Sequence, residues 1–280
     1  MVKMFIDDRR VEAQEGESVL DLARRVGVDI PTLCHNEALE PSGACRLCSV
    51  EVTFPGWDGW RKLVTSCLYP VAEDLRVYTQ SERVQKTRAL LLDLLLARCP
   101  DAPLIQRLAA EHGVRTTSFV PRAEPDDCIL CGLCVRACDK VGAHAITTAQ
   151  RGQHKVIATP FNEPPEECVG CGACAEICPT QCIELREAEG VRSIWERDFE
   201  LLRCQTCQAA FMTVAERDHL VKERGLEESY YQECPSCKRQ RVAESMAEVV
   251  LKTHPDFVPK QMGGEPLPPL PRVSRPGVRP

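Results

Sequence analysis

Eight cysteines between residues 128 and 178 constrain this chain more than any other feature of its sequence. They form two runs with the pattern C-x2-C-x2-C-x3-C, and Pro179 follows the second run. The runs consist of Cys128, Cys131, Cys134 and Cys138, and of Cys168, Cys171, Cys174 and Cys178. One repeated pattern of eight cysteines is far more specific than a single C-x2-C pair. We therefore expect these thiols neither to form a disulfide framework nor to bind zinc as separate knuckles.

The spacing of the two runs is that of the bacterial ferredoxin segment that binds two [4Fe–4S] clusters. The first three thiolates of a run hold one cluster, and the fourth thiolate ligates the other cluster. The predicted ligands of one cluster are therefore Cys128, Cys131, Cys134 and Cys178. The predicted ligands of the other cluster are Cys168, Cys171, Cys174 and Cys138. Cys182, four residues beyond Cys178, is predicted to be a packing thiol and not a ligand.

The composition favours several small modules over one large core. The chain has 280 residues, of which only 5% are aromatic, 21 are prolines and 18 are cysteines. Metal binding supplies folding free energy that a small core lacks. Cysteines used as metal ligands indicate a reducing compartment, so we expect a cytoplasmic protein. A net charge of −6 does not favour nucleic-acid binding. The start of the sequence has no signal-peptide pattern, and its most apolar run, 89–97, is too short to span a membrane.

The region 1–80 is predicted to be a small α+β unit. Strands are expected at 2–6, near Val11, and at 50–54, 63–64 and 75–78. Ser18 and Asp21 form a capping-box pattern that begins a helix, and Gly27 ends it. Four further cysteines occur here, namely Cys34, Cys45, Cys48 and Cys67. Ten residues separate the first two, so the plant-type [2Fe–2S] pattern C-x4-C-x2-C is only partly met.

Three segments of this region resemble a known family. Leu33-Cys34-His35, the segment 43–52 and the segment 63–67 are similar to the [2Fe–2S] head of the large iron–sulfur subunit of respiratory complex I. The diaphorase subunit of NAD-reducing hydrogenases has the same head. The resemblance continues through the paired cysteine runs, in 134–139, 151–152, 159–161 and 178–180. It implies a β-grasp ferredoxin fold and one [2Fe–2S] cluster bound by Cys34, Cys45, Cys48 and Cys67.

The region 81–122 departs from this family. The family carries here a [4Fe–4S] site made of one histidine and three cysteines, but Cys99 is the only cysteine between Cys67 and Cys128. We therefore expect that site to be absent. A long helix from Ser81 and a second helix at 104–112, closed by Gly113, predict a helical spacer. Cys99 is predicted to be a buried structural thiol.

A second cysteine pattern lies near the C-terminus. Cys204 and Cys207 form one C-x2-C pair, and Cys234 and Cys237 form another. Between the pairs, Thr213 and Gly225 are predicted to begin and end a helix. Two such pairs predict a tetrahedral four-cysteine zinc site of the zinc-ribbon type, with a further [4Fe–4S] cluster as the alternative. Another helix is expected at 239–252.

These features divide the chain into five predicted parts of an overall α+β fold. Residues 1–80 are a [2Fe–2S] ferredoxin-like domain, and 81–122 are the helical spacer. Residues 123–190 form the domain with two [4Fe–4S] clusters, and 191–253 form the four-cysteine metal module. Residues 254–280 contain eight prolines and are predicted to be an extended tail.

The sequence contains no G-x-G-x-x-G loop and no nucleophile pattern, so we expect no independent active site. It predicts an electron-transfer subunit of a soluble, hetero-oligomeric oxidoreductase. The resemblance implies two partners, a flavin subunit that binds NAD(P)H and a catalytic subunit of the [NiFe]-hydrogenase type. A formate dehydrogenase or a heterodisulfide-reductase-like bifurcating complex is an alternative. An iron–sulfur redox sensor is the alternative of another class, but three clusters in series favour electron transfer.

Overall fold

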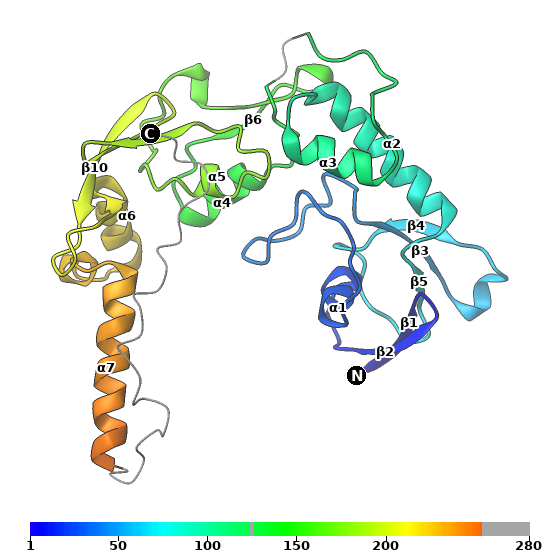
Figure 1. The fold of residues 1–280 in the computed structure, drawn as a ribbon, viewed down its shortest axis with the longest axis horizontal. Coiled ribbons are helices and arrows are strands. Elements are labelled where there is room, and N and C mark those ends of the chain that lie inside the picture. The colour runs from blue at the N-terminus through cyan, green and yellow to red at the C-terminus, as the bar shows by residue number, and fades with distance from the viewer. Residues whose placement is uncertain (124–125, 254–280) are drawn as a thin grey trace. The chain divides into compact units, whose positions relative to one another are not determined.

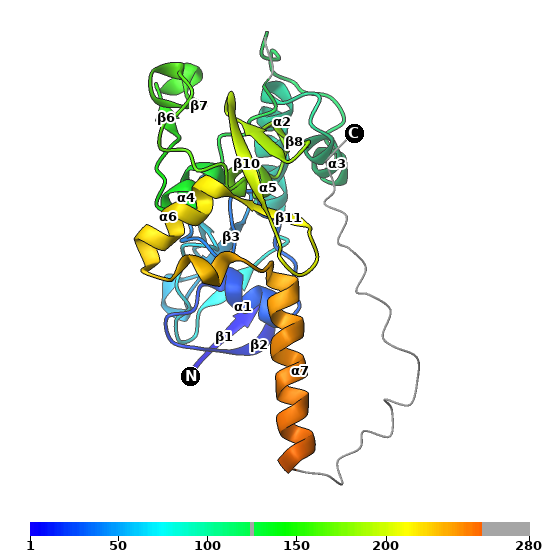
Figure 2. The same ribbon diagram turned by 90° about the vertical axis from the view of Figure 1, so that its left-hand side faces the viewer.

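The computed structural model describes residues 1–123 and 126–253, so the predicted proline-rich tail lies outside the described residues. The chain divides into two units. The first contains Met1–Glu163 and Ala173–Ile183, and the second contains Pro164–Gly172 and the chain from Glu184 onward. Figures 1 and 2 show their helices and strands from two directions.

The first unit begins with a five-stranded sheet in the order β2-β1-β5-β3-β4. Its strands are β1 (Val2–Ile6), β2 (Arg9–Ala13), β3 (Ser49–Thr53), β4 (Lys62–Thr65) and β5 (Arg76–Tyr78). β1 and β5 run parallel, and the other neighbours are antiparallel. A short 3-10 helix, Pro55–Trp57, lies between β3 and β4. All the predicted strands are therefore present, within one or two residues at their ends.

Helix α1 (Val19–Arg25) packs on this sheet because one of its faces is apolar. Val19, Leu20, Leu22 and Ala23 are buried in the same core as Met4 and Ile6. Each large apolar side chain in such a core contributes about 1.5–3 kcal/mol. The Ser18 hydroxyl accepts a hydrogen bond from the Asp21 backbone N–H at 3.2 Å, which confirms the predicted start of the helix.

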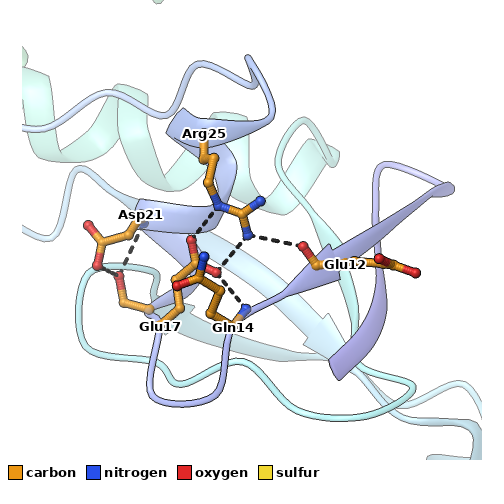
Figure 3. A network of polar contacts seen from close by, with 6 residues as sticks. Glu12, Gln14, Glu17, Asp21 and Arg25 are labelled. Atoms are coloured by element: carbon orange, nitrogen blue, oxygen red, sulfur yellow. Dashed lines mark hydrogen bonds and ion pairs between the residues drawn. The ribbon is translucent and has the colours of Figure 1, made fainter. Parts of the chain in front are cut away.

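Arg25, the last residue of α1, forms hydrogen bonds to residues that precede the helix in the sequence (Figure 3). Its guanidinium donates from Nε and Nη2 to the two carboxylate oxygens of Glu17, at 2.9 and 2.8 Å. Nη2 also donates to the Glu12 carbonyl oxygen at 3.0 Å. Arg25 thus connects the helix to β2 and to the turn that follows β2.

Two helices follow the sheet, as predicted. α2 (Glu82–Arg98) begins after Ser81, whose hydroxyl accepts from the Val84 backbone N–H at 3.3 Å. α3 (Pro103–Glu111) ends at His112, before Gly113. Cys99 is fully buried between the helices, with Leu92, Leu96 and Ile105 in the same apolar cluster. The prediction of a buried structural thiol is confirmed.

The segments that carry the paired cysteine runs contain short elements. Two helices, α4 (Leu133–Val141) and α5 (Ala173–Glu176), each begin within a run. Between the runs, β6 (Thr147–Ala149) and β7 (Val156–Ala158) form a two-stranded antiparallel sheet. Two 3-10 turns, Gly152–His154 and Pro160–Asn162, complete this region.

The second unit contains a four-stranded sheet that the hydrophobic pattern of the sequence does not predict. Its order is β11-β10-β9-β8, with all the pairs antiparallel. The strands are β8 (Leu185–Ala188), β9 (Val191–Ile194), β10 (Arg197–Arg203) and β11 (Ala210–Thr213).

Two helices and a turn follow this sheet. The predicted helix from Thr213 to Gly225 is present as α6 (Val214–Arg224), with the Thr213 hydroxyl accepting from the Glu216 backbone N–H at 3.0 Å. A 3-10 turn, Glu228–Tyr231, separates it from α7 (Pro235–Thr253), which begins four residues earlier than predicted. Within residues 1–123 and 126–253, no helix is long and apolar enough to cross a membrane.

Candidate metal centres

The four cysteines of the first domain lie in two close pairs. The Cys45 backbone N–H donates to the Cys34 sulfur at 3.4 Å. The sulfurs of Cys48 and Cys67 are 3.5 Å apart. Cys67 also interacts electrostatically with Cys34 and Cys45, so the two pairs are neighbours. Two pairs of thiols suit a [2Fe–2S] cluster, in which each of the two irons takes two thiolates.

The surroundings of Cys34 and Cys48 favour the thiolate, which is the form that binds metal, whereas the pKa values of Cys45 and Cys67 are raised. A hydrogen bond from the Cys45 thiol lowers the pKa of Cys34 to about 5. The hydrogen bond between the thiols of Cys48 and Cys67 lowers the pKa of Cys48 to about 6. All four cysteines are buried or partly buried, so this site also limits contact with water.

The first paired run brings Cys128, Cys131 and Cys178 together within the first unit. Burial and, to a smaller extent, the nearby thiolates of Cys178 and Cys128 raise the pKa of Cys131 to about 11. Cys178 thus interacts electrostatically with the first run, as the crossed ligand assignment requires, and the assignment itself stays a prediction. Burial also raises the pKa of Cys134 to about 12, with contributions from Cys131 and Cys128. Buried thiols that oppose one another's ionisation fit a site whose charge is balanced by bound iron.

The backbone around this run also suits thiolate ligands. α4 begins at Leu133, directly after Cys131 and Gly132, so its N-terminal N–H groups lie beside the cysteines. The N-terminus of a helix favours negative charge. The Ala145 backbone N–H donates to the Cys138 sulfur at 3.2 Å.

The second run is held by side chains from the sheet of the second unit. Arg192 is buried and donates from Nη1 to the carbonyl oxygens of Gly170 and Cys171, at 2.9 and 3.0 Å. The Thr213 hydroxyl donates to the Val169 carbonyl oxygen at 2.5 Å. Cys168 and Cys171 belong to the second unit, whereas Cys138 and Cys174 belong to the first. The assignment of these four as ligands of one cluster stays a prediction from their spacing.

The C-terminal cysteines form a compact group. The sulfurs of Cys204, Cys207, Cys234 and Cys237 all lie within 4.8 Å of one another. Cys204 and Cys207 follow β10, whereas Cys234 and Cys237 flank the start of α7. α7 begins at Pro235, the first helical position, where proline is favoured. The predicted C-x2-C pairs are therefore brought together.

Backbone N–H groups point at the sulfurs of this group. Cys234 donates to the Cys204 sulfur at 3.2 Å, and Cys237 donates to the Cys234 sulfur at 3.5 Å. Burial opposes ionisation of Cys204, but the N–H groups of Cys234 and Cys207 outweigh it and lower the Cys204 pKa to about 6. Four thiols with one favoured thiolate can bind a divalent cation.

Three polar residues near the cysteines have roles that the sequence did not indicate. Arg136 donates to two backbone carbonyl oxygens, those of Glu40 and Cys34. His35, the residue after Cys34, has a side chain only 7% exposed. Neither of its ring nitrogens makes a hydrogen bond, and Asp21 is 3.9 Å away. His35 and the buried Arg88 both line a cavity of about 630 Å³.

Comparison with known proteins matches the two regions that carry the twelve predicted cluster ligands to known domains. Residues 1–82 match the 2Fe-2S iron-sulfur cluster binding domain, and residues 122–185 match the 4Fe-4S dicluster domain. These two domains define an iron–sulfur electron-transfer protein.

Three proteins illustrate the relationship. The G 2 subunit of the NADH-quinone oxidoreductase of Rhizobium meliloti (strain 1021) is 32% identical over 205 residues, which are 64% of this chain and 23% of that protein. NADP-reducing hydrogenase subunit HndD of Solidesulfovibrio fructosivorans is 32% identical over 191 residues, which are 58% and 32% of the two chains. In a crystal structure of NAD+-reducing [NiFe]-hydrogenase in the H2-reduced state, one chain aligns with a TM-score of 0.50 and 30% identity. That alignment covers 56% of this chain and 74% of the other.

The chain belongs to the family of iron–sulfur electron-transfer subunits found in the NADH-quinone oxidoreductases and in the NAD- and NADP-reducing hydrogenases. It spans about a quarter to a third of the length of the curated relatives that it matches.

Proposed function

We propose that this chain relays single electrons through one [2Fe–2S] cluster and two [4Fe–4S] clusters within a soluble, cytoplasmic complex. The observation that carries the proposal is one buried apolar cluster of side chains in the first unit. It contains Cys34 and Cys131, and Cys45 and Ile129 pack against it. Cys34 and Cys45 are predicted ligands of the [2Fe–2S] cluster, whereas Cys131 is a predicted ligand of the first [4Fe–4S] cluster. Electron tunnelling weakens steeply with distance, so packed ligands of two clusters favour transfer between them.

The clusters, when bound, supply one-electron chemistry. The residues of this chain bind the clusters, bury them and fix their separation. Cys34 pairs with Cys45, and Cys48 pairs with Cys67, so each pair is assigned to one iron of the [2Fe–2S] cluster. Leu33 and Leu47 exclude water beside that site, since both are buried.

The family indicates which partners to expect. We assign one end of the relay to a flavin subunit that binds NAD(P)H and the other end to a catalytic subunit of the [NiFe]-hydrogenase type. The relatives named above are chains of an NADH-quinone oxidoreductase, an NADP-reducing hydrogenase and an NAD+-reducing [NiFe]-hydrogenase. A formate dehydrogenase or a heterodisulfide-reductase-like complex is the alternative setting. A redox sensor would need only one cluster.

The four-cysteine group near the C-terminus is proposed to hold one zinc ion. A tetrahedral site with Zn–S bonds of about 2.3 Å places its sulfurs about 3.8 Å apart. The sulfurs of Cys207 and Cys234 are 3.8 Å apart, and no pair among the four exceeds 4.8 Å. A [4Fe–4S] cluster, the alternative occupant, binds each thiolate at a separate corner and needs a wider group of sulfurs. Zinc has no redox chemistry, so this site would be structural.

Metal analysis of the anaerobically purified protein tests the proposal. One [2Fe–2S] and two [4Fe–4S] clusters contain 2 + 4 + 4 = 10 iron atoms. We expect about 10 iron atoms and one zinc per chain, with zinc–sulfur scattering at the zinc X-ray absorption edge. A content of about 14 iron atoms would contradict either the zinc site or the absence of the [4Fe–4S] site made of one histidine and three cysteines.

The isolated chain should not reduce an artificial dye with NADH. Addition of its flavin subunit should restore dye reduction, and the clusters should then be reduced by NADH. Robust NADH oxidation by the isolated chain would contradict its assignment as a relay.

A further inference from the structure

A fifth thiol lies among the predicted ligands of the first [4Fe–4S] cluster. The Cys182 sulfur is 3.5 Å from the Cys178 sulfur. Cys182 also forms a side-chain hydrogen bond to Cys128, a ligand from the start of the same predicted set. All three residues belong to the first unit and are partly buried.

A tight turn places Cys182 beside Cys178. The Gln181 backbone N–H donates to the Cys178 carbonyl oxygen at 3.2 Å. Gln181 has a φ of 55°, in the left-handed region that non-glycine residues rarely adopt. This turn reverses the chain after Pro179, so that the backbone N–H of Cys182 hydrogen bonds to the Cys178 sulfur. Both the amide and the thiol of Cys182 therefore face that sulfur.

The separation of the two sulfurs decides how they can bind. Thiolates on different corners of a cubane cluster are held well apart, so the sulfurs of Cys178 and Cys182, 3.5 Å apart, do not fit two corners. They do fit alternative positions at one corner. A change of χ1 between staggered rotamers moves a cysteine sulfur by about 3 Å, which is close to this separation.

We propose that Cys182 is an alternative ligand of the first [4Fe–4S] cluster and exchanges with Cys178 at one iron. The proposal rests on the proposed function, because it takes Cys178 as the fourth ligand of that cluster. It replaces the sequence-based prediction that Cys182 is a packing thiol.

The exchange is balanced in atoms and charge. A bond forms between the Cys182 sulfur and the iron, and the bond between that iron and the Cys178 sulfur breaks. The proton that leaves the Cys182 thiol passes to the Cys178 thiolate along the S–H···S hydrogen bond between them. No electron is gained or lost, so no external oxidant or reductant is needed.

The chain provides a matched internal control. Cys138 occupies the same place in the first run as Cys178 does in the second. The residue four positions after Cys138 is Gly142, so no alternative thiol follows it. Loss of Cys138 should therefore remove a ligand that cannot be replaced in this way.

The experiment compares Cys178→Ala, Cys182→Ala, the double variant and Cys138→Ala, each purified anaerobically without added thiols. Iron and sulfide are counted, and Mössbauer and EPR spectra of the oxidised protein reveal [3Fe–4S] clusters. We expect both single variants at positions 178 and 182 to keep the wild-type iron content. The double variant and Cys138→Ala should each lose one iron per chain and gain a [3Fe–4S] signal. An unchanged [2Fe–2S] spectrum shows in each case that the first domain has folded.

Two results would overturn the proposal in distinguishable ways. If Cys178→Ala alone loses one iron, Cys182 is not an alternative ligand, and the paired-cluster assignment still stands. If the double variant keeps all its iron, neither thiol binds at this corner, and the crossed ligand assignment in the proposed function also fails.

Discussion

The Arg136 guanidinium donates from Nη2 to the backbone carbonyl oxygen of Cys34, at 2.8 Å. Its Nη1 donates to the Glu40 carbonyl oxygen at 2.6 Å. Arg136 lies on α4, between Cys134 and Cys138, whereas Cys34 belongs to the candidate [2Fe–2S] site. One side chain thus joins the helix of the first paired cysteine run to the loop that carries a predicted [2Fe–2S] ligand.

Replacement of Arg136 by methionine should loosen this connection without removing a ligand. The loss of two charged hydrogen bonds should lower the free energy of unfolding by about 2 kcal/mol. Anaerobic unfolding by denaturant, followed by visible circular dichroism of the clusters, measures this change. Lys140→Met on the same helix removes an exposed charge and is the control. Equal unfolding free energies for the two variants would contradict a connecting role for Arg136.

Arg88 should raise the reduction potential of the [2Fe–2S] cluster. This side chain is 1% exposed, donates to the Ser49 carbonyl oxygen at 3.0 Å and interacts with the Cys48 thiolate. Burial lowers the pKa of Arg88, but an arginine remains charged at neutral pH. A nearby positive charge stabilises the reduced cluster, which carries one more negative charge.

Arg88→Met should therefore lower the midpoint potential of the [2Fe–2S] cluster by tens of millivolts, on the order expected for one buried charge. Arg88→Lys keeps the positive charge, so its midpoint potential should stay close to that of the wild type. Lys86→Met, which removes an exposed charge from the same helix, should leave the potential unchanged. An EPR-monitored redox titration measures all three. A potential that does not respond to Arg88→Met would show that this charge is screened from the cluster.

The ion pair of Glu17 and Arg25 should make stability depend on pH in one direction. The hydrogen bond from Arg25 lowers the pKa of Glu17 below its usual 4.5. A lowered folded-state pKa adds stability above the unfolded-state pKa, and this stability is lost as pH falls through the folded value. The destabilisation by Glu17→Gln should thus be constant from about pH 8 to about pH 6 and should shrink below about pH 4.5. Denaturant unfolding followed by tryptophan fluorescence measures the unfolding free energies of the wild type and of Glu17→Gln. A difference between them that grows at low pH would contradict the prediction.

Gly170 should be more sensitive to substitution than Gly132. Both have positive φ, at 65° and 69°. A Cβ on Gly170 would lie 2.5 Å from two ring carbons of Phe199, whereas a Cβ on Gly132 would meet nothing within 4 Å. Gly132→Ala should lower the free energy of unfolding by about 1–2 kcal/mol, because alanine is strained in the left-handed backbone conformation. Gly170→Ala should cost about 1–3 kcal/mol more, because the Phe199 ring must move.

Iron content and thermal stability of the two glycine variants distinguish these costs. The Gly170→Ala protein should lose iron from the cluster of Cys168 and Cys171 on mild heating before the Gly132→Ala protein loses any. Adding Phe199→Leu to Gly170→Ala should recover part of the loss, because it removes the ring. Equal losses of iron and of thermal stability in the two glycine variants would show that backbone strain, and not the clash with Phe199, determines the effect of both substitutions.

The helix starts of this chain can be predicted because their signals are local. Ser18, Ser81 and Thr213 each accept a hydrogen bond from an N–H three residues ahead, as their patterns indicate. The cysteine positions are equally informative, since ligand spacing is encoded in the sequence itself. The start of α7 differs from the prediction because the segment 234–237 has the pattern of a metal knuckle, although its proline also favours the first helical position.

The sheet of the second unit could not be predicted from hydrophobic patterns. Arg192 and Arg197 occupy β9 and β10, and charged residues do not indicate burial in a sequence. Their guanidinium groups instead bind backbone carbonyl oxygens around the second cysteine run, such as those of Cys171 and Glu166, which are 21 and 31 residues away. Such contacts depend on the folded arrangement. The closeness of Cys182 to Cys178 likewise depends on the backbone of Gln181.

The apolar cluster around Cys99 has a consequence for the rate of electron transfer. Leu33, Leu47 and Leu92 belong to this cluster, and Cys45 packs against it. These side chains have no dipoles that must turn when charge arrives at the neighbouring [2Fe–2S] site. A surrounding that rearranges little lowers the reorganisation energy of an electron-transfer step. The helices α2 and α3 would thus speed the transfer beside them, without carrying an electron themselves.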